Sequence, residues 1–172
     1  MQSKPCTKFC KNVSRVRKNK TIIGYIQSVL QGVFVNKSKG AYSMKLTKEM
    51  QEVIGDELAW IATVNNDGTP DLGPKRTMRV LDDEHLIFCE NTDGQHHANI
   101  KANGKIVVGV AKRFDNVGFR FVGKATSYTD SEHMELAKEK AGVMPKAAAI
   151  IIDIEKIYTL NSGPLAGKPV EE

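Results

Sequence analysis

Six extended segments follow one another between Ala59 and Leu160, and this succession limits the folds that the chain can adopt. Turn signals or short helical patterns separate these segments. A parallel sheet would need a crossover helix after each strand, which the sequence does not provide. The order predicts a mainly β fold with short helices, a six-stranded antiparallel split barrel. The segments are residues 59–65 (AWIATVN), 71–81, 85–90 (HLIFCE), 106–111 (IVVGVA), 117–129 (VGFRFVGKATSYT) and 147–160 (AAAIIIDIEKIYTL).

Three short helices are expected beside these strands, because each has apolar residues at helical spacing or a start and a stop signal. In the first, the apolar positions are Leu46, Met50, Val53 and Ile54. The predicted helices with their signals are residues 44–55 (cap Thr47, end Gly55), 93–104 (cap Asp93, end Gly104) and 129–142 (capping box Thr129-x-x-Glu132, end Gly142).

The charge of the chain is divided unevenly between two parts. The chain has 172 residues and a net charge of +5, but residues 1–43 hold nine of the 25 basic residues and none of the 20 acidic ones. The remainder therefore carries 16 basic residues against all 20 acidic ones, a net of −4. Its acidic balance gives no reason to expect the folded domain to bind nucleic acid.

Residues 1–43 form a basic N-terminal extension whose origin the sequence leaves open. The apolar stretch 21–35 is interrupted by polar residues and is too short to span a bilayer, and it lacks a signal-peptide cleavage site. An amphipathic surface helix that meets anionic lipid or nucleic acid is one reading. We favour another interpretation, in which the codons for Lys39-Gly40-Ala41 contain a ribosome-binding sequence. The native protein then begins at Met44, and the folded domain is residues 44–172.

The three cysteines, Cys6, Cys10 and Cys89, do not form the even, spaced set of a disulfide framework. A reducing, cytoplasmic location is the expectation that follows. No partner side chains at zinc spacing accompany Cys6 and Cys10, so no metal site is expected there. Cys89 lies within an apolar strand and is interpreted as a packed small side chain rather than a nucleophile.

The stretch GPKRTMRVL, residues 73–81, concentrates cations in an otherwise acidic domain. In a continuous strand, side chains alternate between faces, which would put Lys75, Thr77 and Arg79 on one side and Arg76 and Met78 on the other. Two cations and a hydroxyl on one face can hold a phosphate. A charged outer face of the barrel is the competing interpretation.

The next predicted helix starts in the segment CENTDGQHHANIKANGK, residues 89–105, which contains two adjacent histidines. The N-terminus of a helix presents free N–H groups and favours an anion. His96 and His97 are neighbours and point to different sides of a helix, so they do not form a zinc site. A surface or capping role and a contact with a phosphate or cofactor both stay open.

Familiar catalytic motifs are absent: the chain has no GxSxG, P-loop or HExxH sequence, and no GxGxxG after a strand. Their absence disfavours covalent hydrolase chemistry and Rossmann-type cofactor binding.

The run from Trp60 to Val110, followed by FRFVGKA and a final hydrophobic strand, resembles the pyridoxamine 5′-phosphate oxidase-like family of FMN-binding split β-barrels. The small flavin-nucleotide-binding members, with an ATV-x-x-DG-x-P opening and a PK-containing second strand, are the most similar. The resemblance implies a homodimer with two FMN molecules in grooves between the subunits. It covers the chain from about Leu46 to its end.

The resemblance also implies which residues meet the cofactor. In the family, the flavin or its phosphate is lined by residues that correspond here to the second strand and to the end of the third strand. The family's cationic phosphate site falls on Gln95 and His96. Here the sequence departs from the family, since glutamine has no charge and histidine is only partly protonated near neutrality. If His96 completes the phosphate site, FMN should bind more tightly at pH 6 than at pH 8. The cofactor-binding residues so expected are Lys75, Arg76, Thr77, Met78, Arg79, Cys89, Glu90, Asn91, Gln95 and His96.

The function that this resemblance implies is an FMN-dependent oxidoreductase that transfers hydride or electrons, with a nicotinamide or a protein as electron donor. No catalytic acid or base can be assigned. Oxidation of pyridoxamine phosphate itself is not expected, because the chain ends in a Gly/Pro-rich tail, NSGPLAGKPVEE, instead of a substrate-binding segment. The alternative is a protein that binds or carries FMN, haem or another flavin-like ligand without turnover.

Overall fold

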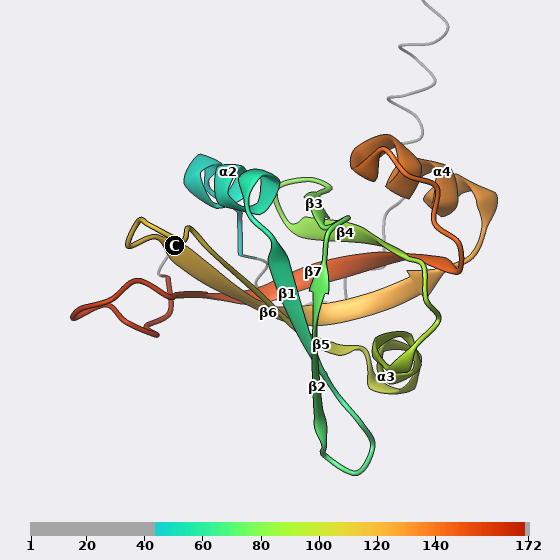
Figure 1. Cartoon of the computed structure of the whole chain (residues 1–172), viewed down its shortest axis with the longest axis horizontal. Helices are drawn as coiled ribbons and strands as arrows, with labels where there is room; N and C mark the ends of the chain where they lie inside the picture. The colour runs from blue at the N-terminus through green and yellow to red at the C-terminus, as the bar shows by residue number, and fades with distance from the viewer. Residues whose placement is uncertain (1–43, 171–172) are drawn as a thin grey trace, which may run out of the picture. The chain divides into compact units, whose positions relative to one another are not determined.

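The computed structural model describes residues 44–170, and within them seven strands form one antiparallel sheet with three helices beside it. The sheet has the order β2-β1-β5-β6-β7-β4-β3 and curls into a half-barrel (Figure 1). The helices are α2 (Lys48–Asp56), α3 (Gln95–Asn103) and α4 (Ser131–Ala141). The strands are β1 (Ala59–Val64), β2 (Pro70–Lys75), β3 (Arg79–Val80), β4 (His85–Glu90), β5 (Lys105–Ala111), β6 (Gly118–Tyr128) and β7 (Ala148–Thr159). The predicted fold class, a mainly β split barrel, is confirmed.

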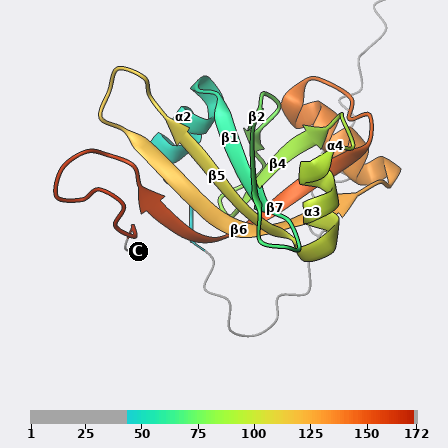
Figure 2. The ribbon, with the colours of Figure 1, turned by 60° about the horizontal axis from the view of Figure 1, so that its bottom comes forward.

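The core fills the concave side of the curled sheet and is closed by α2. Phe88, Phe121 and Ile152 have at most 1% of their surface exposed, and Met50 and Val53 of α2 pack in the same cluster. A second, smaller cluster lies between β4, β7 and α4 and contains Ile87, Cys89, Ala137, Ala149 and Ile151. Figure 2 shows α3 where β1, β2 and β5 converge, and α3 contacts β1 and β6.

The predicted extended segment 71–81 is not one strand, and this correction changes the predicted site. Its chain leaves the sheet at Arg76–Met78, where the Met78 N–H donates to the Lys75 carbonyl oxygen at 3.2 Å, and re-enters it as β3. Met78 is turned into the core with 1% exposure. The simple alternation that would have put Lys75, Thr77 and Arg79 on a common face is therefore wrong, and the sheet has seven strands instead of six.

Two of the predicted helix caps are also corrected. The α3 N-cap is Gly94 instead of Asp93, and no side chain caps it. The α4 N-cap is Asp130 instead of Thr129, and its carboxylate accepts the His133 N–H at 3.1 Å. A carboxylate at this position is as good a cap as a threonine hydroxyl, so the local sequence alone could not separate the two.

The other helix signals act as predicted, apart from one residue at the end of α2. Thr47 caps α2 by accepting the Met50 N–H at 3.3 Å, and the helix ends at Asp56, one residue beyond Gly55. Gly104 and Gly142 end their helices with φ of 69° and 72°, in the left-handed region that glycine adopts without strain. The hypotheses about residues 1–43 lie outside the described residues. No helix in residues 44–170 has the length and apolar character needed to cross a membrane.

Gly123 is the glycine at which an added methyl group would do most harm. It lies at the register shift between β6 and β7, where a Cβ would collide with the backbone carbonyl oxygen of Asp153. Because backbone must move to relieve this contact, Gly123→Ala is expected to lower the free energy of unfolding by at least about 2 kcal/mol, measured by urea denaturation. Gly109→Ala on β5 is the matched control, since a Cβ there has open space around it. Equal, small effects of both changes would contradict this account of the bulge.

His85 ties β4 to two carboxylates and should make the fold sensitive to alkaline pH. Its Nδ1 lies 2.7 Å from Asp82 Oδ1 and its Nε2 lies 3.1 Å from Asp153 Oδ1. The hydrogen bonds to Asp153 and Asp82 raise the pKa of His85 to about 10. A raised pKa contributes stability that is complete below about pH 6.5 and is lost as the pH rises toward 10. Chemical denaturation of His85→Gln should therefore show a smaller loss of stability between pH 6.5 and 10 than the wild type does, and identical slopes would contradict it.

Candidate functional site

Lys75 and Glu90 form a buried ion pair where β2 and β4 end. Lys75 Nζ lies 2.6 Å from Glu90 Oε2, and the glutamate side chain has no exposed surface. The second carboxylate oxygen accepts the Thr92 N–H at 2.8 Å and the Thr92 hydroxyl at 2.7 Å. Burial alone would raise the pKa of Glu90, but Lys75 and Thr92 outweigh it and lower the pKa to about 2. The charge of Lys75 is therefore neutralised inside the fold.

Thr77 and Cys89 join the irregular segment after β2 to β4. The Thr77 hydroxyl donates to the Cys89 carbonyl oxygen at 3.2 Å and accepts the Cys89 N–H at 3.1 Å. The Cys89 thiol points toward α4 and donates to the Val143 carbonyl oxygen at 3.2 Å. Burial raises the pKa of Cys89, which keeps it a thiol. Its side chain is packed as the sequence predicted, so only its backbone can line a cofactor.

Of the three cations in the segment 75–79, Arg76 is the one left without a partner. The Arg79 guanidinium turns back on its own backbone and donates to the carbonyl oxygens of Met78 at 2.6 Å and Arg76 at 3.0 Å. Lys75 is paired with Glu90. The exposed Arg76 side chain has no hydrogen bond or ion pair within the described part of the chain. It is available to an anion.

The first residues of α3 are held against β1 by a chain of side-chain hydrogen bonds. Gln95 Nε2 donates to Asn65 Oδ1 at 2.8 Å and to Asn99 Oδ1 at 2.9 Å. Asn99 Nδ2 in turn donates to Thr63 Oγ1 at 3.0 Å, which lies 3.0 Å from His96 Nδ1. His96 Nδ1 also lies 3.3 Å from Asp71 Oδ2, so a proton on Nδ1 can be donated to this carboxylate or to Thr63 Oγ1.

The surroundings of His96 favour its neutral form. Burial lowers the pKa of His96, and the charge of Lys75 lowers it further, against the opposing effects of Asp71 and Glu90. The His96 ring lies so close to Gly73 that a Cβ there would be 2.8 Å from Nε2. Without a bound anion His96 is thus a neutral hydrogen-bonding group. Tighter FMN binding at pH 6 stays a prediction, and it requires that the bound phosphate stabilise the protonated form of the His96 ring.

The remaining expected residue, Asn91, follows β4 and links it to the segment before β7. Its Oδ1 accepts the Lys146 N–H at 2.9 Å. Asn91 directly follows Glu90 in the chain, and Gly94, the uncapped start of α3, comes three residues later. The structure thus joins Lys75 to Glu90 and Thr77 to Cys89. Gln95 and His96 instead contact β1 and the residue after it, and Met78 is turned into the core.

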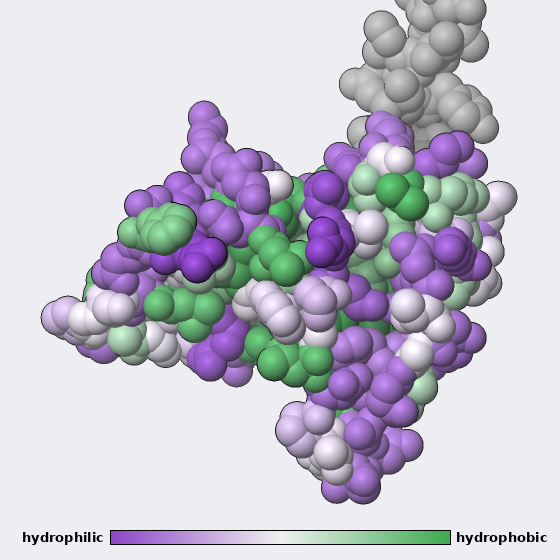
Figure 3. All heavy atoms as spheres, in the orientation of Figure 1, coloured by the Kyte–Doolittle hydropathy of each residue, from purple (hydrophilic) through white to green (hydrophobic). Residues whose placement is uncertain are grey.

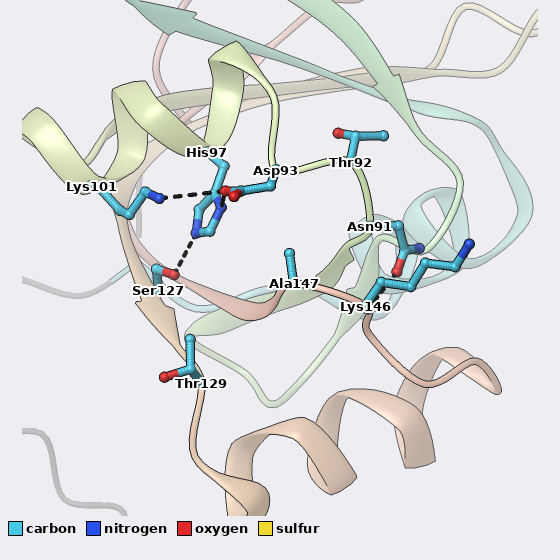
Figure 4. A pocket seen from close by; sticks show the side chains of 9 residues that line it. All are labelled: Asn91, Thr92, Asp93, His97, Lys101, Ser127, Thr129, Lys146 and Ala147. Carbon is cyan, nitrogen blue, oxygen red and sulfur yellow. Dashed lines mark hydrogen bonds and ion pairs between the residues drawn. The ribbon is translucent and has the colours of Figure 1, made fainter.

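An open pocket of about 510 Å³ on the other side of α3 is lined by polar residues that the sequence analysis did not group together (Figure 4). His97 lies between Asp93 and Ser127 at its edge. No sequence signal points to this group, because Ser127 and His97 are 30 positions apart and belong to no known motif. The lining residues are Asn91, Thr92, Asp93, His97, Lys101, Ser127, Thr129, Lys146 and Ala147.

Comparison with known proteins agrees with the fold. The family model described as pyridoxamine 5′-phosphate oxidase matches residues 46–161, about two thirds of the chain. The chain belongs to the pyridoxamine 5′-phosphate oxidase-like family of FMN-binding split barrels, as the resemblance predicted.

Three relatives illustrate this membership. An uncharacterized protein of Methanocaldococcus jannaschii is 34% identical over 132 residues, 73% of this chain and 87% of that protein. The crystal structure of HupZ from Group A Streptococcus is 45% identical, with a TM-score of 0.64, and covers 71% of this chain and 99% of its own. An FMN-binding protein from Syntrophomonas wolfei shares the fold at 14% identity and a TM-score of 0.59, and covers 83% of this chain and 99% of its own.

Proposed function

We propose that the protein is an FMN-dependent oxidoreductase that acts as a homodimer, with its substrate still to be identified. Membership of an FMN-binding family is the general support. The specific support is the exposed Arg76 guanidinium, which directly follows β2 and has no partner within residues 44–170. FMN, when bound, supplies the hydride or electron transfer, and the protein supplies position and electrostatics.

The donor groups present suit a flavin phosphate and its ribityl chain. Because Gly94 gives no side-chain cap, the first N–H groups of α3 are available to an anion. Arg76 adds a full positive charge and a bidentate fork. The Asn91 side-chain nitrogen, which has no partner within residues 44–170, can donate to a hydroxyl or carbonyl oxygen. In this arrangement Arg76 replaces the fixed cation that the family carries at the position of His96.

A second copy of the chain is the partner that the surface favours. Trp60 and Leu72 lie on adjacent strands of the sheet and keep 46% and 67% of their surface exposed. On the same side, Arg120 stacks over Tyr158 at 4.4 Å and has a buried Nε without a hydrogen-bond partner. Figure 3 shows hydrophobic surface in the middle of one face of the molecule. An apolar sheet face of this kind is typically covered in a dimer, in which the family's flavin grooves lie.

A spectroscopic experiment tests the oxidoreductase proposal. The absorbance of the FMN-loaded protein at about 450 nm should fall when NADH, NADPH or a reduced electron-transfer protein is added without oxygen, and an acceptor should restore this absorbance. Failure of nicotinamides and of reduced ferredoxin- and flavodoxin-type donors alike would overturn it. We expect this reaction to take place in the cytoplasm, because the three cysteines do not form the even, spaced set of a disulfide framework.

A flavin carrier without turnover is the second candidate, and one observation favours it. The ionisable groups of the site are engaged with one another: Lys75 with Glu90, and His96 with Thr63 and Asp71. None of them is poised to donate a proton to a substrate. Retention of FMN through dialysis together with inertness to every donor class would support the carrier.

A further inference from the structure

Three side chains at the edge of the pocket beside α3 form a continuous hydrogen-bonded chain (Figure 4). His97 Nδ1 lies 2.5 Å from Asp93 Oδ1, and His97 Nε2 lies 2.8 Å from Ser127 Oγ. A carboxylate cannot donate, so it accepts the Nδ1 proton and leaves the Nε2 lone pair to accept the serine hydroxyl proton. A hydroxyl, an imidazole base and an orienting carboxylate thus have the contacts and roles of a nucleophilic triad.

The backbone holds this arrangement in place from two distant parts of the chain. His97 is in the first turn of α3 with 4% of its surface exposed, and Ser127 is near the end of β6, which α3 contacts. Asp93 has a φ of 47°, and among the described residues it is the sole non-glycine in the left-handed region. Such a conformation costs free energy in a non-glycine residue and is concentrated at functional positions. Hydrogen bonds from His97 and then Lys101 lower the pKa of Asp93, so it stays ionised.

The pocket that these residues line selects for a particular kind of substrate. Lys101 and Lys146 line it with Ser127 and Thr129. Lys101 Nζ lies 3.4 Å from the Asp93 carboxylate, and Lys146 has an exposed side chain. The two ammonium groups outnumber the one carboxylate of the lining, that of Asp93, so the net positive charge of the pocket favours a small molecule that carries negative charge.

We propose that Ser127 is a nucleophile and His97 its general base, in a site that hydrolyses small esters carrying an anionic group. Ser127 Oγ bonds to the carbonyl carbon while His97 Nε2 takes its proton; the bond to the leaving oxygen then breaks, and that oxygen receives the proton from His97. Water attacks the acyl-serine with His97 again as base, which releases the acid and restores the hydroxyl. Asp93 is a positioning residue. This site uses none of the proposed flavin residues except Asn91, which lines both.

Covalent labelling with a fluorophosphonate tests the proposal without any flavin. We expect one adduct per chain, located on Ser127 by peptide mass spectrometry and absent in Ser127→Ala. Asp93→Asn keeps the side-chain shape and tolerates the left-handed backbone, so it removes the charge alone. It should slow the labelling rate at least tenfold with an unchanged unfolding midpoint. Ser131→Ala, which changes an exposed serine outside the lining of the pocket, should label at the wild-type rate.

A substrate assay is a second test of the proposal. The succinate half-ester of 4-nitrophenol should be hydrolysed with a higher kcat/KM than 4-nitrophenyl acetate, and Lys101→Ala should reduce that preference at least threefold. An unlabelled Ser127, an adduct on another residue, or equal labelling rates in the wild type and folded Asp93→Asn would each overturn the proposal. Equal kcat/KM for the two esters would overturn the assigned substrate class.

Discussion

Lys75→Met is expected to lower the free energy of unfolding by about 3 kcal/mol, because it leaves the Glu90 carboxylate buried without its cation. Methionine matches the length of the lysine stem, so the change removes a charge with little loss of packing. The two Thr92 hydrogen bonds stay and keep Glu90 partly satisfied. Urea denaturation at neutral pH measures the loss.

The double variant Lys75→Met/Glu90→Gln is the control for this first prediction. If the loss comes from the uncompensated charge, neutralising Glu90 should recover most of it, and the two changes should be strongly non-additive. Additive losses would show instead that the pair does not act as a unit.

The same pair predicts a response to acid. The pKa of Glu90 is lowered to about 2, against an ordinary value near 4.5. A lowered pKa contributes stability that is present above about pH 4.5 and is lost as the pH falls toward 2. Lys75→Met removes the main cation that holds this pKa down, so the variant should lose less stability than the wild type between pH 5 and pH 2.

Arg76→Ala is expected to weaken FMN binding about 30-fold, as the loss of a charge-assisted, bidentate contact to a phosphate costs about 1.5–3 kcal/mol. The side chain is exposed and has no partner within residues 44–170, so the free energy of unfolding should not change. Fluorescence titration of the apoprotein with FMN gives the affinity.

Arg113→Ala is the matched control, since Arg113 is an exposed arginine in the turn between β5 and β6 that touches the Phe114 ring alone. It should bind FMN as the wild type does. A similar loss in both variants would indicate a general charge effect, and no loss in Arg76→Ala would remove Arg76 from the site. Riboflavin, which lacks the phosphate, should bind wild type and Arg76→Ala equally.

The order of the elements could be predicted because each strand and helix carries its own local signal. The alternation of Ile106, Val108 and Val110 into the core, the Thr47 cap and the glycine ends of α3 and α4 are set by nearby residues. The family resemblance rested on this order, and the family model confirms it.

The break after β2 could not be predicted, because contacts from elsewhere in the chain cause it. Thr77 leaves the strand to bond the backbone of Cys89, and Met78 turns inward to fill the core. The sequence therefore gave the cations of this segment the wrong neighbours: Lys75 pairs with Glu90, and Arg76 has no partner within the described residues.

The residues around His97 were missed for a related reason. The spacing of His96 and His97 predicts that they point to different sides of the helix, but it does not predict which strand each ring meets. His96 meets Thr63 of β1, and His97 meets Ser127 of β6. Side-chain partners at such separations follow from the packing of α3 between these strands, which local spacing does not reveal.

Size-exclusion chromatography of the protein after incubation with FMN tests most directly the central claim, that the protein is an FMN-binding homodimer. Absorbance is followed at 280 nm and at about 450 nm. The account predicts that flavin absorbance co-elutes with protein at the mass of two chains, with one FMN for each chain. Elution of all flavin at the position of the free molecule, from protein that is folded, would contradict it.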